Sequence, residues 1–325
     1  MDSGFWKNLP KPFFALAPMA DVTDCVFRQI IAKYSRHSEE GGGPDVFWTE
    51  FVAADGLVSA GREVLKRDLV FGKNEHPIVA QLFGGTPEKM FKAAELVREL
   101  GFDGIDINMG CPDRTIEKQG AGAAMIKTPS LAKEIIKAAR EGSGLPISVK
   151  TRLGYNKNQM EEWLPALLSE KLSALTVHLR TRKEMSLVPA KWDLMPEIVK
   201  MAHGTGALVI GNGDVKNLAE ARLLSEKTGC DGIMLGRAIF GNPWLFDENK
   251  KEVTIKEKLN VLSEQSLLFE KELGDIKSFA VMKKHFKAYV DGFPGAKELR
   301  LRLMEKNSAE DVAEEVKTFL AKQTN

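Results

Sequence analysis

Seven short apolar runs along this chain each end in a polar or charged side chain. These side chains are Glu50, Gln81, Asn108, Lys150, His178, Asn212 and Arg237. An eighth run ends at Pro18 and Met19. An unpaired buried polar group costs about 1–3 kcal/mol, so packing alone explains such a series poorly. We therefore expect these side chains to face one cavity and to bind or transform a polar ligand there.

A cysteine stands in a polar, glycine-containing stretch after the fourth run. Cys111 lies in NMGCPDRTIEKQGAGAAM (residues 108–125), where Pro112 stiffens the chain and three glycines suit a tight, mobile loop. A thiol exposed on such a loop can donate or accept a proton, with a pKa that its neighbours adjust. Cys25 and Cys230 lie in apolar surroundings and are expected to be inert. No second soft ligand has suitable spacing, so we expect no metal.

Lys150 and His178 end two neighbouring runs, in SVKTR and TVHLRTR. Burial of a lysine is costly, so a lysine in such a place usually has a function. Lys150 could form a Schiff base, act as an acid or base, stabilise an anion, or extend to solvent at a rim, and the residue type leaves these roles open. A lone histidine after an apolar run is more often a packed core residue. The register of His178 with Lys150 and Asn212 favours a ligand or phosphate contact.

Glycine turns follow the last two runs, in GNGD (residues 211–214) and LGRA (residues 235–238). Glycine lets backbone N–H groups approach an anion closely, and Arg237 can add charge-assisted hydrogen bonds. Each turn alone would be an ordinary tight turn. Two such turns after the last two strands of a barrel predict a phosphate site.

The eight runs alternate with longer amphipathic stretches. The runs are residues 13–18, 46–49, 78–83, 104–107, 147–150, 174–177, 207–210 and 232–235. Their near-continuous apolar character predicts parallel strands buried on both faces. Helical patterns cover residues 87–100 (with Thr86 as N-cap), 130–141, 159–170 and 217–228. We predict an α/β fold, a (β/α)8 TIM barrel, because an open doubly wound sheet would not place a polar group after nearly every strand.

From about residue 254 onward the pattern is helical and contains no credible strand. We predict two domains, a catalytic barrel over residues 1–250 and a small C-terminal helical bundle over residues 251–325. Residues 277–302 carry a net charge of +5, whereas residues 303–325 carry −2. This local asymmetry makes the first of these segments a candidate for binding an anionic partner.

The whole chain of 325 residues carries a formal net charge of +1, so any nucleic-acid partner must be bound by a local patch. Its three cysteines are too few for a disulfide framework and indicate a reducing compartment. We find no signal pattern and no apolar run of membrane-spanning length, and therefore expect a cytoplasmic protein without a membrane partner. A monomer is the simplest expectation. The polar, glycine-rich residues 35–45 predict a surface loop, to which we assign no function.

The sequence resembles the tRNA-dihydrouridine synthase family over nearly its whole length. The matching stretches are ALAPMADVTD (15–24), VAQLFG (79–84), DINMGCP (106–112), GAGAAM (120–125), VKTRLG (149–154), TVHLRTR (176–182), GNGD (211–214), GRAIFGNPW (236–244) and VMKKHFKAYVDGFPGAKELR (281–300). Motifs in this order and spacing are highly specific. The resemblance implies a barrel followed by a helical bundle, with FMN as the cofactor.

The resemblance also implies which residues hold the cofactor. The isoalloxazine ring would be lined by Pro18, Met19 and Gln81, and its pyrimidine edge would be held by Lys150. The ribityl chain and phosphate would be held by His178, Asn212, Gly213, Asp214, Gly236 and Arg237. A fixed cation near the pyrimidine edge would favour the reduced, anionic flavin.

The reaction that the resemblance implies reduces uridine in tRNA. NADPH would reduce FMN, hydride would pass from flavin N5 to uracil C6, and Cys111 would protonate C5 as the general acid. Asn108 and Arg180 would orient the uracil, which must leave its stack to reach the flavin. The tRNA backbone would be bound within residues 277–302, by Lys283, Lys284, Lys287 and Arg300.

The sequence departs from the family pattern at two places, and two alternative functions are considered. Leu179 stands where family members often have glycine, and the aromatic residue usual in the following loop is absent until Trp192. A flavin barrel that acts on a free pyrimidine, similar to a dihydroorotate dehydrogenase, would explain the FMN positions and the loop cysteine but not the basic helical segment. A non-catalytic, RNA-binding barrel would explain that segment but not Cys111 beside a complete flavin site.

Overall fold

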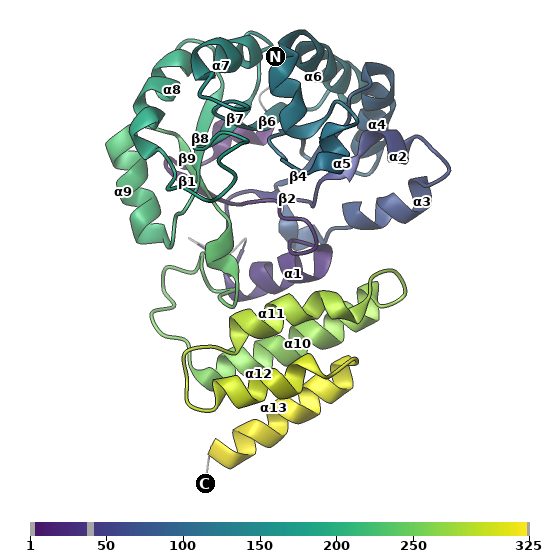
Figure 1. Cartoon of the computed structure of the whole chain (residues 1–325), viewed down its shortest axis with the longest axis vertical. Coiled ribbons are helices and arrows are strands. Elements are labelled where there is room, and N and C mark those ends of the chain that lie inside the picture. The colour runs from purple at the N-terminus through teal and green to yellow at the C-terminus, as the bar shows by residue number, and fades with distance from the viewer. Residues whose placement is uncertain (1–3, 38–41, 324–325) are drawn as a thin grey trace. The chain divides into compact units, whose positions relative to one another are not determined.

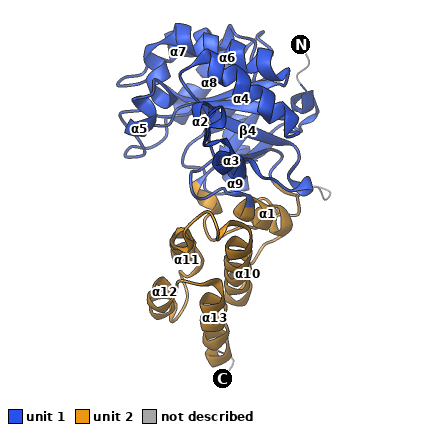
Figure 2. Ribbon diagram, turned by 90° about the vertical axis from the view of Figure 1, so that its right-hand side faces the viewer, with its two compact units in different colours: residues 1–25, 44–236 blue, residues 26–43, 237–325 orange. Residues whose placement is uncertain are grey.

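The computed structural model describes residues 4–37 and 42–323, which divide into two compact units (Figure 2). The barrel unit contains the described residues up to 25 and residues 44–236. The helical unit contains the described part of 26–43 and of 237–325. The division therefore differs from the boundary expected between residues 250 and 251, because the described part of 26–43 and residues 237–250 group with the helices. Part of the loop expected at 35–45 lies outside the described residues.

The barrel unit is built on one parallel sheet (Figure 1). Its described strands are β1 (Phe13–Leu16), β2 (Phe47–Trp48), β3 (Val52–Ala53), β4 (Ile78–Phe83), β5 (Gly104–Met109), β6 (Ile147–Arg152), β7 (Ala174–His178), β8 (Leu208–Asn212) and β9 (Gly232–Leu235). The order is β1-β9-β8-β7-β6-β5-β4-β2, and a bridge from Ala15 to Val46 nearly closes the barrel. The predicted barrel and its eight strands are confirmed. The short β3, which pairs with β4, is an addition that the apolar runs did not predict.

Helices follow the strands. They are α2 (Ala54–Leu57), α3 (Arg62–Leu65), α4 (Pro87–Glu99), α5 (Arg114–Glu117), α6 (Pro129–Ser143), α7 (Met160–Leu168), α8 (Met195–Ala202) and α9 (Leu218–Thr228). The four predicted helices are present as α4, α6, α7 and α9. Thr86 occupies the N-cap position of α4, but its side chain makes no capping hydrogen bond. Asn217 does cap α9, because its side chain accepts a 2.8 Å hydrogen bond from the Glu220 N–H.

The inside of the barrel changes from apolar to polar along the strands. At the amino-terminal side, Trp6 of the 3-10 helix η1 (Gly4–Asn8) packs against Phe13 and Trp48, with ring centroids 6.2 and 6.0 Å away. Buried polar side chains follow further along the strands, among them Gln81 and Asp106. The apolar end is filled by side chains, so the polar end is where a ligand can enter.

The helical unit contains α1 (Cys25–Tyr34) from residue 26 onward, α10 (Ile255–Leu273), α11 (Lys283–Tyr289), α12 (Ala296–Met304) and α13 (Ala309–Gln323). Thr254 and Glu257 form a capping box that starts α10. The Lys33 Nζ lies 2.6 Å from a Glu264 carboxylate oxygen, which ties α1 to α10. None of the described helices is long and apolar enough to cross a membrane.

A histidine in the core of the helical unit has no hydrogen-bond partner among the described residues. His285 is fully buried, with its ring 4.8 Å from that of Phe27 and 6.0 Å from that of Phe240. Burial, and next the charge of Lys284, lowers the pKa of His285 from 6.5 to about 3. The folded protein therefore leaves this ring neutral at pH values where the unfolded chain protonates it.

We predict that His285→Met stabilises the helical unit by about 1–2 kcal/mol, because it removes two unpaired buried nitrogens. Because the pKa of His285 is lower in the folded than in the unfolded protein, the wild type loses stability as the pH falls from 6.5 towards about 3, and the variant should lose less. Thermal melts between pH 4 and 8 would measure this. The exposed His203, changed to Gln, is the control. An unchanged acid sensitivity in His285→Met would contradict the prediction.

Candidate active site

The expected strand-end residues of β5 to β8 lie side by side. Asn108 pairs with Lys150 across β5 and β6, and His178 pairs with Asn212 across β7 and β8. The Lys150 Nζ donates a 3.0 Å hydrogen bond to the Asn212 Oδ1, although β7 lies between their strands. Both side chains must therefore face the inside of the barrel at its carboxyl end.

The positive charges at this end are partly withdrawn from water. Burial, followed by repulsion from Arg152, lowers the pKa of Lys150 to about 8, against the opposing influence of Asp106 and Cys111. Burial also lowers the pKa of Arg152 to about 10. The charges that act on Lys150 come from one cation, Arg152, and one carboxylate, Asp106, so together with its own charge the surroundings of Lys150 carry a positive surplus. Such a site is suited to an anion.

Asp106 lies fully buried in β5 and holds two neighbouring side chains. The Ser148 hydroxyl donates to its Oδ1 and the Gln81 amide donates to its Oδ2, both at 2.6 Å. Burial raises the pKa of Asp106 to about 6, although these hydrogen bonds and the charge of Lys150 oppose the shift. The carboxylate is therefore the major form at neutral pH.

Cys111 follows β5 at a half-buried position. The Asn108 Oδ1 accepts hydrogen bonds from the backbone N–H groups of Gly110 (3.1 Å) and Cys111 (2.9 Å). A side chain at Gly122, where φ is +60°, would come within 2.8 Å of the Cys111 carbonyl, so this approach requires glycine. Burial raises the pKa of the Cys111 thiol above its ordinary value, so the thiol stays protonated at neutral pH.

Two arginines connect the loop after β5 to the loop after β7. Arg152 donates from Nε to the Gly110 carbonyl at 2.7 Å and from Nη1 to the Met185 carbonyl at 3.0 Å. Arg182 donates from Nε to a Glu117 carboxylate oxygen at 2.8 Å. These bonds hold the cysteine loop and the β7 loop against each other.

The ends of β7 and β8 form a second set of polar contacts. Arg180 is almost fully buried and donates to the Val188 carbonyl (2.6 Å), the His178 Nε2 (3.0 Å) and the Asp214 carboxylate. A guanidinium can only donate, so the His178 Nε2 is the acceptor. Three N–H groups of Arg180 thus already have protein acceptors. At Gly213, with φ of +136°, a side chain would meet the Ala190 Cβ at 2.7 Å.

The ends of β1 and β9 also meet. A side chain at Gly236 would lie 3.6 Å from the Ala17 Cβ and 3.8 Å from the Met19 Sδ, so these positions are neighbours. Pro18 and Met19 are half-buried. Arg237 is exposed, starts the 3-10 helix η6 (Arg237–Ile239), and falls within the helical unit. The strand-end Glu50 is buried and accepts from the Asp21 N–H.

The basic residues expected to bind a partner lie on α11 and α12. Lys283, Lys284 and Lys287 share one face of α11, whereas His285 and Phe286 are buried on its other side. Arg300 of α12 donates to the Val290 carbonyl at 3.1 Å and lies 3.5 Å from an Asp291 oxygen. The α11 lysines therefore offer more charge to a partner than Arg300 does.

Sequence reasoning missed Asp106 and Arg152 as site residues. The sequence contains a signal for each of them. Asp106 interrupts the apolar run GIDI, and Arg152 follows Lys150 at the two-residue spacing that puts both on one face of a strand. The two departures from the family pattern also have structural explanations. Leu179 is fully buried. Trp192 donates to the Gly213 carbonyl at 2.9 Å and so supports the end of β8.

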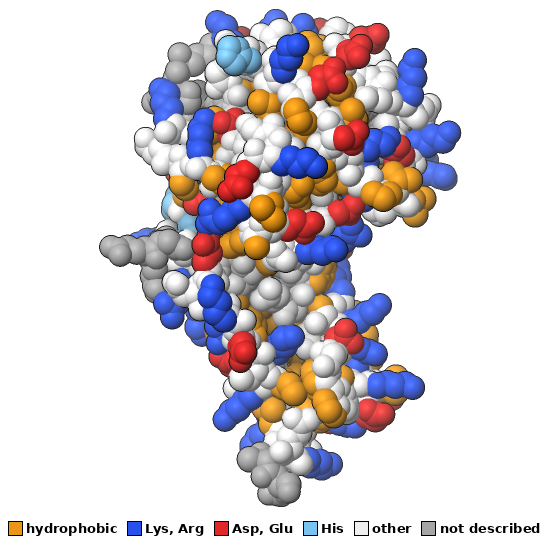
Figure 3. Space-filling model, turned by 90° about the vertical axis from the view of Figure 1, so that its left-hand side faces the viewer, with side chains coloured by type: hydrophobic (Ala, Val, Ile, Leu, Met, Phe, Trp, Pro, Cys, Tyr) orange, Lys and Arg blue, Asp and Glu red, His pale blue; other side chains and the backbone are white. Residues whose placement is uncertain are grey.

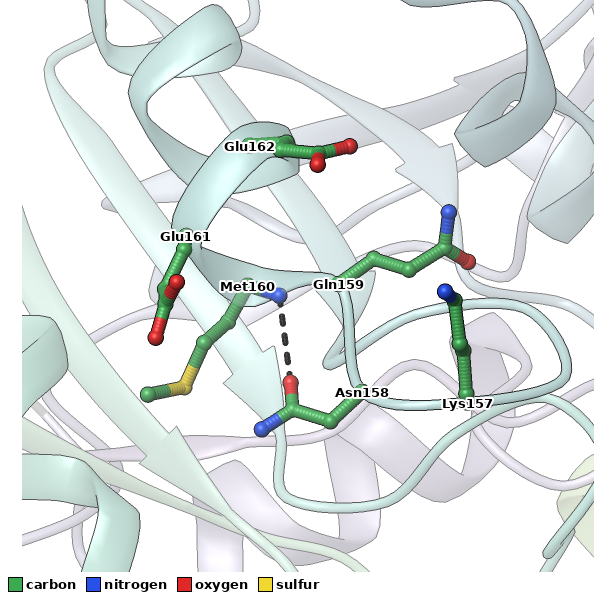
Figure 4. Close-up of a pocket in the computed structure, with 6 residues that line it drawn as sticks. All are labelled: Lys157, Asn158, Gln159, Met160, Glu161 and Glu162. Carbon is green, nitrogen blue, oxygen red and sulfur yellow. Dashed lines mark hydrogen bonds between the residues drawn. The ribbon is translucent and has the colours of Figure 1, made fainter.

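A separate hollow is lined by residues 157–162, where the loop after β6 enters α7 (Figure 4). The residues expected to do chemistry do not line it. Glu161 and Glu162 make it unsuited to a phosphate. Over the described ranges 4–37 and 42–323, no group of three His, Cys, Asp or Glu side chains could hold a metal ion.

A barrel whose main path has eight parallel strands, with polar side chains gathered at the carboxyl ends of these strands, defines an α/β-barrel enzyme. A sequence profile described as "Dihydrouridine synthase (Dus)" matches residues 15–324. The chain therefore belongs to the dihydrouridine synthase family, which confirms the prediction from its motifs.

Individual relatives agree with this assignment. "Probable tRNA-dihydrouridine synthase 2" of Bacillus subtilis (strain 168) is 42% identical over 317 residues, which cover 96% of this chain and 95% of that protein. "Probable tRNA-dihydrouridine synthase" of Staphylococcus aureus (strain Mu50 / ATCC 700699) is 42% identical over 313 residues, 95% of this chain and 93% of that protein.

Solved structures show the same fold in more distant proteins. Histamine dehydrogenase from Rhizobium sp. 4-9 matches 80% of this chain with a TM-score of 0.54 and 11% identity. The 6-hydroxypseudooxynicotine amine oxidase of Pseudomonas geniculata N1 matches 84% with a TM-score of 0.52 and 11% identity. This chain spans 48% and 54% of those longer chains, so the likeness concerns the barrel fold.

We predict that Arg152→Met loosens the β7 loop, because the carbonyls that Arg152 bonds lose their donor. Tryptic cleavage within residues 181–191 should accelerate about tenfold, the effect of about 1.4 kcal/mol less protection. Lys157→Met, which removes an exposed cation from the neighbouring loop, is the matched control and should be cut at the wild-type rate. Equal cleavage of both variants would show that Arg152 does not hold the loop.

Proposed function

We propose that this protein reduces the C5–C6 double bond of uridine in tRNA. Bound FMN would supply the hydride, and NADPH would supply the electrons that restore it. The observation that carries the proposal is the surplus positive charge around Lys150. A thiol that stays protonated, Cys111, follows the neighbouring strand β5. Names of the relatives, which refer to tRNA and dihydrouridine, support the same substrate.

The residues present fit an anionic flavin. Only one of the three N–H groups of Lys150 has an acceptor in the described structure, at Asn212, so two remain for a ligand. We propose that Lys150 binds the pyrimidine edge of the ring system, beside Gln81. Pro18 and Met19 would pack against the ring, and Met19 lies next to Gly236, where the absence of a side chain leaves the backbone open.

The ends of β7 and β8 fit the phosphate and ribityl chain. Arg180 neutralises Asp214, so the carboxylate does not repel a phosphate there. A side chain at Gly213 would meet the Ala190 Cβ at 2.7 Å, so glycine lets the backbone after β8 pass close to His178. We propose that the phosphate and ribityl chain are held by His178, Asn212, Gly213, Asp214, Gly236 and Arg237.

Cys111 is proposed to be the general acid. Because burial raises its pKa, it enters the reaction as a neutral thiol and can deliver a proton to C5 of the uracil. Asn108 and Arg180 are proposed to orient the base. Each uses part of its hydrogen-bonding capacity within the protein, so each would act through its remaining N–H groups.

We propose that the helical unit binds the phosphate backbone of tRNA through Lys283, Lys284 and Lys287, with a smaller contribution from Arg300. Charges of both signs are interspersed on the face drawn in Figure 3. A local stripe such as the exposed face of α11 is then the feature that can attract a polyanion.

We predict that Cys111→Ala lowers dihydrouridine formation on unmodified tRNA at least about a hundredfold, the usual contribution of a general acid. The variant should still bind FMN and stay yellow, because the thiol belongs to the substrate side. Mass spectrometry of nucleosides from the treated tRNA measures the product, and the buried Cys230→Ala is the control. Full activity in Cys111→Ala would contradict the role of the thiol. Turnover of orotate or free uracil with none on tRNA would contradict the substrate.

We predict that FMN affinity is constant below about pH 8 and falls above it, because the ammonium of Lys150 loses its proton there. Lys150→Met should bind FMN more weakly at neutral pH and should lack this fall between pH 7 and 9. Quenching of flavin fluorescence on titration measures both, with Lys157→Met as the control. A wild-type affinity that does not change over this range would contradict the assignment of Lys150.

A further inference from the structure

We infer that Asp106 is a positioning residue for Cys111, as the terminal acceptor of a hydrogen-bond chain that runs through Gln81 and Asn108. Asp106 is fully buried and would touch neither the substrate nor the cofactor. Its effect on the reaction rests on the proposed function. Its effect on the cysteine loop does not.

The chain is continuous from the carboxylate to the backbone of the cysteine. The Gln81 Nε2 donates to the Asp106 Oδ2 at 2.6 Å, and the Asn108 Nδ2 donates to the Gln81 Oε1 at 3.0 Å. The Asn108 Oδ1 then accepts from the N–H groups of Gly110 at 3.1 Å and Cys111 at 2.9 Å. Four hydrogen bonds thus connect the middle of β5 to the start of the cysteine loop.

Every bond in this chain points the same way. Backbone N–H groups can only donate, so the Asn108 oxygen must face them and its NH2 must face Gln81. The Gln81 NH2 then faces Asp106, which can only accept when ionised. A charged acceptor at the end of such a chain strengthens each bond before it. Asp106 therefore fixes the orientation of both amides that reach the proposed flavin and uracil sites.

Two further observations explain why a carboxylate stands here. The positive charge of Lys150 acts on Asp106 and favours its ionised form against the cost of burial. Ser148 satisfies the second oxygen, since its hydroxyl donates to the Asp106 Oδ1 at 2.6 Å. Ser148 shares the carboxylate but is not part of the chain to Cys111, so it offers a matched control.

The test uses Asp106→Leu, Asp106→Asn and Ser148→Ala in the full-length protein. Leucine branches at the same carbon as aspartate but is larger and has no acceptor, whereas asparagine is nearly the same size as aspartate and keeps one neutral acceptor oxygen. The readout is the rate at which iodoacetamide alkylates Cys111, with Cys111→Ala as the blank. Because Cys25 and Cys230 are buried, Cys111 should dominate the reaction.

We expect alkylation of Cys111 to accelerate about fivefold in Asp106→Leu, about twofold in Asp106→Asn and not at all in Ser148→Ala. The kcat for dihydrouridine formation should fall about tenfold in Asp106→Leu, while the KM for tRNA stays within about twofold. Asparagine should fold even if leucine does not, because it matches the shape of aspartate and keeps an acceptor for one of the two donors, Gln81 and Ser148. If leucine does not fold, the test compares the alkylation rates of Cys111 in Asp106→Asn and Ser148→Ala alone.

Equal alkylation rates in the wild type, Asp106→Asn and Ser148→Ala would overturn the inference, as would an effect of Ser148→Ala as large as that of Asp106→Asn. Either result would make Asp106 an ordinary buried residue that contributes only to stability. A wild-type protein that forms no dihydrouridine, but whose variants keep the expected order of alkylation, would instead refute the proposed function and leave the positioning role in place.

Discussion

The cost of holding charge away from water governs the carboxyl end of this barrel. Burial is the largest cause of the pKa shifts of Lys150, Arg152 and Asp106, and it drives each group towards its neutral form. Each group remains charged at neutral pH because a polar partner or an opposite charge is placed beside it. A site that withdraws two cations from water gains most from an anionic ligand, which is the basis of the proposed flavin site.

The same constraint explains how the loops are held. Arg152 is buried beside Lys150, and its hydrogen bonds to the Gly110 and Met185 carbonyls compensate for lost water. One residue thereby fixes both the loop that carries Cys111 and the loop after β7. The opposite end of the barrel is packed around the apolar rings of Trp6 and Trp48. The side chains expected to do chemistry thus gather at the other end.

The strands could be predicted because a strand buried on both faces has a nearly continuous apolar sequence, as in residues 78–83. The residues at strand ends could be predicted because the fold brings those ends together. Hydrogen-bond partners that come from distant parts of the chain could not be predicted. Arg180, for example, bonds His178, Val188 and Asp214, a combination that only the folded chain creates. Likewise, α1 follows the first strand in sequence but packs with α10 through Lys33 and Glu264.

If Lys150 lies in a site that needs an anion, binding of FMN should raise its pKa and take up protons. Calorimetric titration of FMN at pH 8.5, in two buffers of different ionisation enthalpy, gives the number of protons taken up. Because the pKa of Lys150 lies near 8 before binding and should rise beside an anion, the account predicts uptake of a fraction of one proton, absent in Lys150→Met. Binding without proton uptake, or equal uptake in Lys150→Met, would contradict the account.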